Sequence, residues 1–177
     1  MKKLVTYIAC LGFVSLFSMS SLAQNVAVID TQAAILQTQV AQDAFKALEE
    51  ESEYASMVEQ AKELQTERQS LIETLQKDAE TLSNEEIAEL QKDIQENGQD
   101  LEFILGKIQA KQNETVQSVA TELNPQMMKI INDLKISKKI QILLGADQVL
   151  FSDSSVSITE QVTDALDGAA SAESQSD

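Results

Sequence analysis

The feature that most constrains the fold is a stretch from Ala41 to Leu82 that contains neither glycine nor proline. Apolar side chains recur in it every three or four residues, the spacing of a helix that buries one narrow stripe. The heptad a positions hold Tyr54, Ala61, Leu75 and Leu82, and the d positions hold Met57, Leu64 and Leu71. We therefore predict a long helix that packs against a second helix.

A second heptad pattern begins at Ile87 and continues through Ile94, Leu101 and Ile108. Between the two patterns, Ser83 and Glu86 have the S-x-x-E spacing of a capping box, which marks a new helix start. With a turn near residues 83–85, the stripes match across an antiparallel hairpin that sets Leu64 opposite Leu105 and Ala61 opposite Ile108. The alternative is one uninterrupted parallel coiled coil, and the cap favours the hairpin.

This predicted seam is interrupted by polar and small residues. Polar residues occupy core positions at Arg68, Asp78, Asn97 and Lys111, and glycines interrupt the second helix at 98 and 106. Each glycine costs about 1 kcal/mol relative to alanine. Pro125 lacks an amide proton and clashes with the preceding turn, so we expect a kink or break near Asn124. The arms should bend and fray.

Short β-favouring segments flank the helical region at residues 26–29, 139–144 and 149–151, and a turn signal at 145–148 predicts that the last two form a hairpin. Asp30 or Thr31 can cap a short helix over residues 32–37. A second capping box, Ser157 to Glu160, opens a final helix with Ile158, Val162, Ala165 and Leu166 on one face. Residues 168–177 are small and acidic and should form a disordered tail.

The expected fold class is mainly α with a small β body, from which a long antiparallel helical hairpin extends. We assign residues 24–40 and 135–167 to a discontinuous α+β body and residues 41–134 to the arm. Three short strands and two short helices cannot fill a core alone, and such a sheet leaves two unpaired edges. We therefore expect the chain to self-associate through its strands.

Composition excludes several functions. The chain has no histidine, 29 acidic and 13 basic residues, and a formal net charge of -16. Histidine-dependent catalysis is excluded, and nucleic acid is not expected as a partner because its affinity comes from lysine and arginine. No catalytic, metal-binding or cofactor-binding residue is predicted. Glu49, Glu50, Glu51 and Glu53 diverge around a helix and are interpreted as solvated rather than as a cation site.

The first 23 residues have the pattern of a secretory signal peptide. A basic start at Lys2 and Lys3 precedes an apolar run that is too short to span a bilayer. Small residues then predict cleavage between Ala23 and Gln24. Cys10 leaves with the signal, so the exported chain has no cysteine.

The order of these elements resembles the Skp/OmpH family of periplasmic chaperones. The resemblance rests on V-A-V-I-D with a short helix, the long hairpin, Asn124-Pro125, the segments I-Q-I-L-L-G and V-L-F-S-D, and I-T-E-Q-V-T-D-A-L at the end. It implies a homotrimer in the periplasm of a Gram-negative bacterium, with helical tentacles that hold unfolded outer-membrane β-barrel proteins without ATP.

Carried onto this chain, the resemblance implies two sets of residues. The trimer body would use Val26, Val28, Ile29, Ile140, Ile142, Leu144, Val149 and Phe151. The arm would contact its client through Tyr54, Met57, Leu64, Leu71, Phe103 and Leu105. The alternative function is a structural or adaptor coiled coil of the cell envelope, which would need a straight, well-packed seam.

One departure from the family matters. Its well-described members have basic tentacles, whereas residues 41–100 here carry 17 acids and 5 bases. No lipopolysaccharide-binding cluster can therefore be transferred, and membrane contact through the arms is not expected. We interpret most of these acids as a solvated face that maintains solubility.

Overall fold

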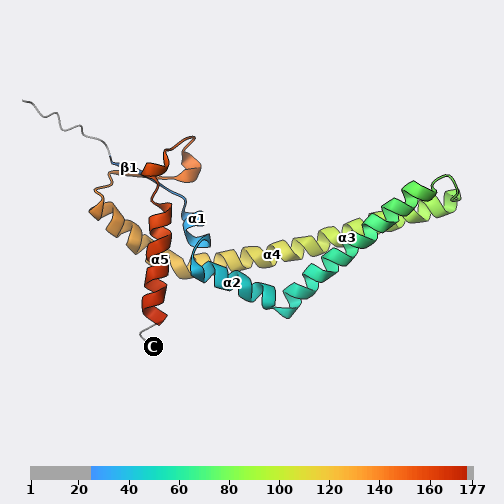
Figure 1. The fold of residues 1–177 in the computed structure, drawn as a ribbon, viewed down its shortest axis with the longest axis horizontal. Coiled ribbons are helices and arrows are strands. Elements are labelled where there is room, and N and C mark those ends of the chain that lie inside the picture. The colour runs from blue at the N-terminus through green and yellow to red at the C-terminus, as the bar shows by residue number, and fades with distance from the viewer. Residues whose placement is uncertain (1–24, 175–177) are drawn as a thin grey trace, which may run out of the picture.

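The computed structural model describes residues 25–174, which form a small body with one long helical arm (Figure 1). The predicted signal peptide, its cleavage site at Ala23 and Gln24, and residues 175–177 lie outside the described residues. The elements in chain order are β1 (Val26–Ile29), α1 (Thr31–Leu36), α2 (Gln39–Glu50), α3 (Ser52–Asp78), α4 (Asn84–Ser137), β2 (Ile142–Gly145), the 3₁₀ turns η1 (Ala146–Gln148) and η2 (Ser154–Val156), and α5 (Thr159–Ser174). The fold is mostly helical, with long helices and a small strand element.

The arm consists of α3 and the portion of α4 that lies beside it, joined by a turn (Figure 1). The predicted capping box begins α4. The amide of Ser83 donates to Glu86 Oε2 at 2.8 Å, and the amide of Glu86 donates to Ser83 Oγ at 3.3 Å. The Ser83 hydroxyl also donates to Glu86 Oε2 at 2.8 Å, and the two bonds that the carboxylate accepts, the backbone bond first, lower the pKa of Glu86. The charged form of this side chain therefore holds the turn.

The predicted continuous helix from Ala41 to Leu82 is wrong, because the helix breaks at Glu51 and ends at Asp78. Glu51 has an extended conformation, with ψ at 123°. Its carboxylate lies 3.2 Å from Lys111 Nζ on α4, a contact across the seam that the heptad pattern does not encode. The break allows α2 to leave the line of α3 and join the body.

The register of the arm also differs from the prediction. Asn97 bonds to Glu67, and Gln112 bonds to Tyr54. A turn centred at residues 83–85 would instead set Gln112 opposite Met57, so the observed pairing is offset by about one helical turn. The reason is local: α3 ends at Asp78, and residues 79–83 form the connection.

The kink or break expected near Asn124 takes the form of a bend without a break: α4 continues through Pro125 for 54 residues in all, and its last part turns away from the line of the arm (Figure 1). A proline inside a helix costs about 3 kcal/mol. Val119, Leu123, Met127 and Ile130 on either side of it are buried in the body core. Burial of each such side chain contributes roughly 1.5–3 kcal/mol, so the body packing outweighs the local penalty.

The sheet has two strands among the described residues, with β1 and β2 parallel and Val26 paired with Ile142. The predicted third strand and its hairpin are wrong: residues 146–148 form η1, and residues 149–151 are irregular. The other side of β1 is taken by Ser157 in an isolated bridge, and the amide of Ile158 donates to the Val28 carbonyl at 2.9 Å.

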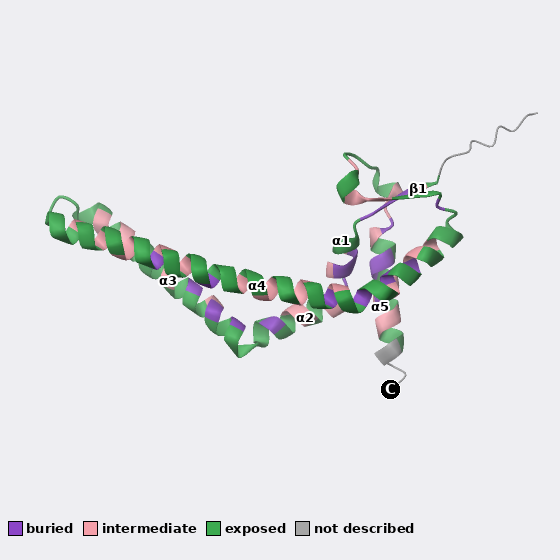
Figure 2. Cartoon of the chain, turned by 180° about the vertical axis from the view of Figure 1, so that it is seen from behind, coloured by how far each residue is buried: buried purple, intermediate pink, exposed green. Residues whose placement is uncertain are grey.

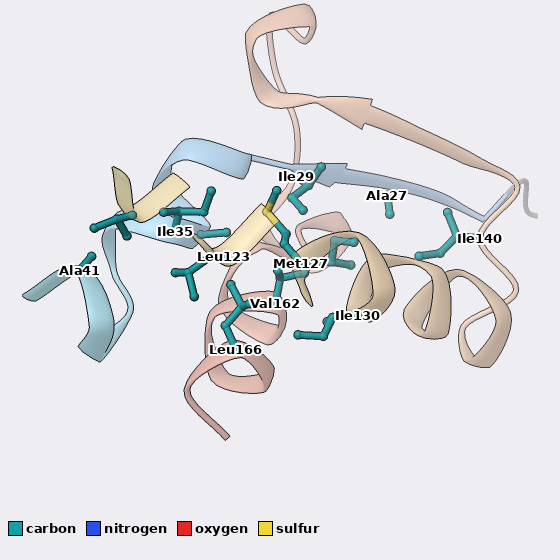
Figure 3. Close-up of a cluster of buried hydrophobic side chains, with 13 residues drawn as sticks. Ala27, Ile29, Ile35, Ala41, Leu123, Met127, Ile130, Ile140, Val162 and Leu166 are labelled. Atoms are coloured by element: carbon teal, nitrogen blue, oxygen red, sulfur yellow. The ribbon is translucent and has the colours of Figure 1, made fainter. Parts of the chain in front are cut away.

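The body core lies between β1, the helices α1 and α2, the last third of α4, and α5 (Figure 3). Its buried members are Ala27, Ile29, Ala34, Ile35, Ala41, Val119, Leu123, Met127, Ile130, Ile140, Ile158, Val162 and Leu166. One chain therefore packs a larger core than its segments suggested.

The end of α4 is closed by a Schellman motif. The amide of Ile140 donates to the Lys135 carbonyl and that of Lys139 to the Ile136 carbonyl. Lys139 is left-handed, with φ at 54°. This position usually holds glycine, because the conformation costs other residues about 1–2 kcal/mol. The buried Ile140 packs in the same core as Leu134, which is the usual accompanying contact.

The predicted disordered tail is wrong up to residue 174, since α5 extends that far. Asp167 accepts the amide of Gln39, at the start of α2, at 2.8 Å, and this contact anchors the helix where the acidic tail was expected to begin. The expected capping box at residues 157–160 takes another form, because Ser157 Oγ accepts the amide of Thr159 at 3.4 Å.

Ser83→Ala should lower the free energy of unfolding by about 1 kcal/mol, because the Glu86 amide loses its side-chain acceptor. Urea denaturation followed by circular dichroism measures this. Ser70→Ala, on the exposed face of α3, is the matched control and should change stability by less than about 0.5 kcal/mol.

The contribution of the Ser83–Glu86 cap to the free energy of unfolding should depend on pH, and the same urea denaturation measures it. Because the folded-state pKa of Glu86 lies below its ordinary value of 4.5, its stabilising contribution is present above that value and is lost as the pH falls through the lowered pKa. Equal destabilisation by both serine variants would show that the cap does not hold the turn.

Candidate functional site

The candidate functional surfaces are the outer faces of the arm and the outer edge of the body. Figure 2 shows buried residues along the inner faces of α3 and α4 and in the body, with exposed residues along the outer faces of the arm. Within residues 25–174 no helix is long and apolar enough to cross a membrane, and no three acidic, histidine or cysteine side chains lie together as metal ligands.

The seam of the arm is a hydrophobic cluster formed by Leu48, Tyr54, Met57, Ala61 and Ile104. The phenolic oxygen of Tyr54 accepts a hydrogen bond from Gln112 Nε2 at 2.8 Å. Tyr54 and Met57, predicted as client contacts, are therefore packed inside the arm. The apolar stripe that identified them is the stripe that holds the two helices together.

The outward apolar side chains of the arm lie on α4. Phe103 is 62% exposed and Leu105 is 49% exposed. Lys107 Nζ lies 4.5 Å from the centre of the Phe103 ring, in a cation–π contact. Leu64 and Leu71 are half-buried at the edge of the seam. Of the predicted client contacts, Phe103 and Leu105 are thus the most accessible.

A buried amide interrupts the seam in the middle of the arm. Asn97 is 7% exposed, and its Nδ2 donates to Glu67 Oε2 at 3.1 Å. Its Oδ1 is buried and accepts no hydrogen bond. The Arg68 side chain passes beside Gly98 on the next turn. An unpaired buried oxygen costs about 1–3 kcal/mol, so this layer weakens the packing of the arm.

A charged contact lies at the break between α2 and α3. Lys111 is partly buried and lies 3.2 Å from Glu51 and 3.8 Å from Glu53. The hydrogen bond that Lys111 Nζ donates to Glu51 is the main cause of the raised pKa of Lys111. This lysine was predicted at a core position, and its ammonium reaches the two carboxylates at the seam's margin.

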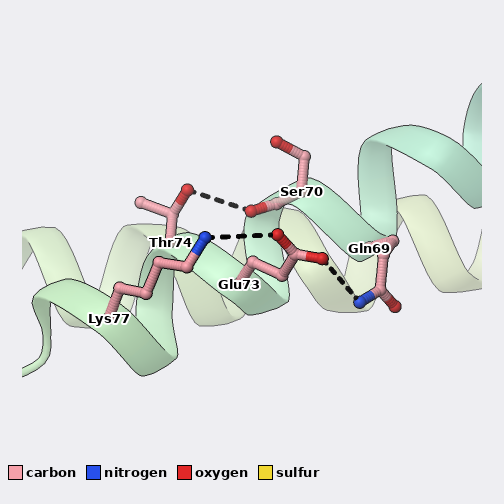
Figure 4. A network of polar contacts seen from close by, with 5 residues as sticks. All are labelled: Gln69, Ser70, Glu73, Thr74 and Lys77. Atoms are coloured by element: carbon pink, nitrogen blue, oxygen red, sulfur yellow. Dashed lines mark hydrogen bonds and ion pairs between the residues drawn. The ribbon is translucent and has the colours of Figure 1, made fainter.

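The outer face of α3 is polar and solvated (Figure 4). Glu73 accepts from Gln69 Nε2 at 3.0 Å and pairs with Lys77 at 3.4 Å, each four residues away along the helix. Such exposed pairs contribute about 0.3–0.5 kcal/mol. They keep this face soluble and offer no apolar contact to a partner.

The predicted trimer-body residues differ in how far they are buried. Val28, Ile29 and Ile140 are buried inside the chain's own body, and Val26, Leu144 and Val149 are half-buried. Ile142 and Phe151 are exposed. Leu143 and Leu150 are exposed beside them, although the sequence did not single them out. The alternation of side chains along a two-sided strand was the signal that could have identified Leu143.

The outer edge of β2 is unpaired within the described chain, because the two-stranded sheet joins β2 to β1 alone. The segment that follows it carries Leu150 at 108% and Phe151 at 87% exposure. An open strand edge next to exposed apolar side chains is a favourable surface for pairing with another chain.

The geometry of a body with one long helical arm can now be compared with known proteins. A family profile described as outer membrane protein (OmpH-like) matches residues 25–166. The chain belongs to the OmpH-like family. The match includes both the body and the arm, so it covers most of the described fold.

A solved structure from Caulobacter crescentus, described as a candidate outer membrane chaperone (OmpH-like), is similar to this chain at 15% sequence identity and a TM-score of 0.46. The alignment covers 82% of this chain and 85% of that one. A comparison with curated proteins gave no match.

Asn97→Leu should raise the free energy of unfolding by about 1 kcal/mol, because it removes the unpaired Oδ1 and returns Glu67 to water. Chemical denaturation of the whole chain measures this. Asn113→Leu is the matched control on the exposed face of α4, and it makes the same change in helix propensity without burial. A destabilised Asn97 variant would show that the amide contributes more to the arm than its one hydrogen bond suggests.

Proposed function

We propose that this protein is an ATP-independent periplasmic holdase chaperone that assembles as a homotrimer and holds unfolded outer-membrane β-barrel proteins between its arms. The observation that carries the proposal is the OmpH-like family match over residues 25–166, which includes the entire arm. The signal-peptide pattern at residues 1–23 supports export to the periplasm.

The arm supports holding by weak contacts distributed over its length. Phe103 and Leu105 are exposed on different sides of α4, and half-buried Leu64 and Leu71 lie on α3. Many shallow contacts suit a client that is unfolded and presents no fixed shape, whereas a specific docking partner would need complementary packing.

The weakened seam also favours holding over scaffolding. The unpaired amide at Asn97, the exposed helix break at Glu51 and the small residue at Gly106 all reduce the stiffness of the arm. A coiled coil that spaces envelope components would need a straight seam. An arm that encloses clients of different sizes needs a seam that bends.

Assembly through the body is supported by the open edge of β2. Exposed Ile142, Leu143, Leu150 and Phe151 adjoin this edge and would be buried by strands of other copies. The arm seam is already satisfied within one chain by α3 and α4. Oligomerisation therefore depends on the body and is independent of the arm.

Deleting residues 56–108 and closing the gap with a short glycine-rich turn should leave a trimer. The ends can be joined because Tyr54 and Gln112, beside the cut, are in contact. Light scattering on the size-exclusion peak gives the mass. The full-length control, Leu143→Lys with Phe151→Lys, should be smaller than a trimer. A monomeric deletion variant together with a trimeric control would place the assembly contacts in the arm.

The mature chain should suppress the aggregation of a urea-unfolded, acidic outer-membrane β-barrel protein on dilution, and the arm-deleted variant should not.

The dissociation constant for this client should stay constant or fall between low and moderate salt, because the acidic arm repels an acidic client and salt screens charges beyond about 8 Å. Fluorescence anisotropy of the labelled client measures it. Steep weakening with salt would mean that arm lysines recruit the client by charge.

A further inference from the structure

The charge of the chain is reversed at the end of α4. Residues 125–142 contain four lysines, Lys129, Lys135, Lys138 and Lys139, and a single acid, Asp133. All four lysines are exposed, and none takes part in the ion pairs found within the described residues. This stretch lies past α5, at the end of the molecule away from the arm tip (Figure 1). We name it, by its four lysines with Met128 and Ile136, the basic end.

The basic end also exposes large apolar side chains. Ile136 is 74% exposed and Met128 is 60% exposed. Met128, the exposed Asn132 and Ile136 follow one another at four-residue steps on one side of the helix, and Lys129 and Lys135 border this line, each seven residues from one of the two apolar residues. The opposite face, with Met127 and Ile130, is buried in the body core. An apolar strip flanked by unpaired lysines is the pattern of a helix that lies on an anionic lipid surface.

Lys139 supplies a second, independent observation. It occupies the left-handed position of the Schellman motif, where glycine is free of strain. Its backbone is held there by Asn25, whose Nδ2 donates to the Lys139 carbonyl at 3.3 Å, and its side chain is directed to solvent. Lys139 thus presents its ammonium to solvent from a left-handed backbone position that glycine would adopt without strain.

We propose that the basic end is a docking surface for an anionic phospholipid bilayer. The charges are complementary: lysine ammonium groups attract the headgroup phosphates while Ile136 and Met128 enter the boundary with the acyl chains. The arrangement also orients the molecule. The arm, with its 17 acids and 5 bases over residues 41–100, is directed away from the negative surface that would repel it. This proposal does not depend on the holdase function.

The test is sedimentation of the full mature chain with vesicles of phosphatidylcholine containing phosphatidylglycerol, and with pure phosphatidylcholine vesicles. The chain should pellet with the anionic vesicles alone. Replacing Lys129, Lys135, Lys138 and Lys139 by glutamine should reduce binding by roughly 600-fold if the four act independently, since each lysine near an anionic surface changes the affinity about five-fold. The matched control replaces Lys62, Lys77, Lys92 and Lys107 of the arm by glutamine and should still bind.

Two further variants separate charge from folding. Lys139→Gly should raise the thermal unfolding midpoint while weakening vesicle binding about five-fold, a combination that a structural role would not produce. Ile136→Ser should weaken binding with the charge unchanged. Circular dichroism verifies that every variant is folded.

Several results would overturn the proposal. Failure of the wild-type chain to bind anionic vesicles would do so, as would equal binding to neutral vesicles or equal loss in the two four-lysine variants. A changed sedimentation coefficient of the basic-end variant without lipid would assign these lysines to contact between subunits. Lysine-dependent binding of polyglutamate, without vesicle binding, would assign them to an acidic polypeptide.

Discussion

The packing of α4 against the rest of the chain is the interaction on which both hydrophobic cores depend. Its first part contributes Ile104 to the seam of the arm, and its last third contributes Leu123, Met127 and Ile130 to the body. At about 1.5 Å per residue, 54 residues give a rod of roughly 81 Å. The helix is unbroken but bends where it enters the body, in the region of Pro125 (Figure 1), so the direction of the arm relative to the body depends on this bend.

The two cores differ in how well their buried polar groups are paired, and this difference agrees with their proposed roles. The buried polar side chains of the body, Thr38 and Thr163, donate to backbone carbonyls, whereas the arm seam includes the buried Asn97 with one unpaired oxygen. A polar layer in a two-helix seam weakens packing locally and permits bending at little cost. The body, which would carry the contacts between subunits, needs a defined shape. The arm, which would surround clients of different shapes, benefits from a seam that can bend.

Charge is distributed as unevenly as packing. The arm is acidic, and unpaired lysines are concentrated at the far end of α4. The resemblance to a family with basic tentacles implied contact with acidic lipid at the tentacle tips, which this chain does not support. In the proposed docking, the reversed distribution instead turns the body end toward a negative surface. A net charge of -16 therefore describes neither end of the molecule well.

The sequence alone determined the features that rest on local chemistry: β1, the helical arm, the capping box at Ser83 and the apolar face of α5. It also indicated the OmpH-like family. It did not determine the break at Glu51, the one-turn offset in register, the unbroken course of α4 through Pro125 or the irregular course of residues 149–151. The register offset follows from the early end of α3 at Asp78. The others depend on contacts between segments distant in the chain, such as Lys111 with Glu51 and Val28 with Ser157.

The candidate site follows the same division. A heptad pattern identifies which side chains are apolar at helical spacing, but Tyr54 and Phe103 look alike in sequence until the partner helix is placed. Tyr54 then lies inside the seam and Phe103 faces solvent. Local propensity acts over a few residues and can be read from the chain, whereas burial depends on which faces meet. Only the tertiary structure decides that.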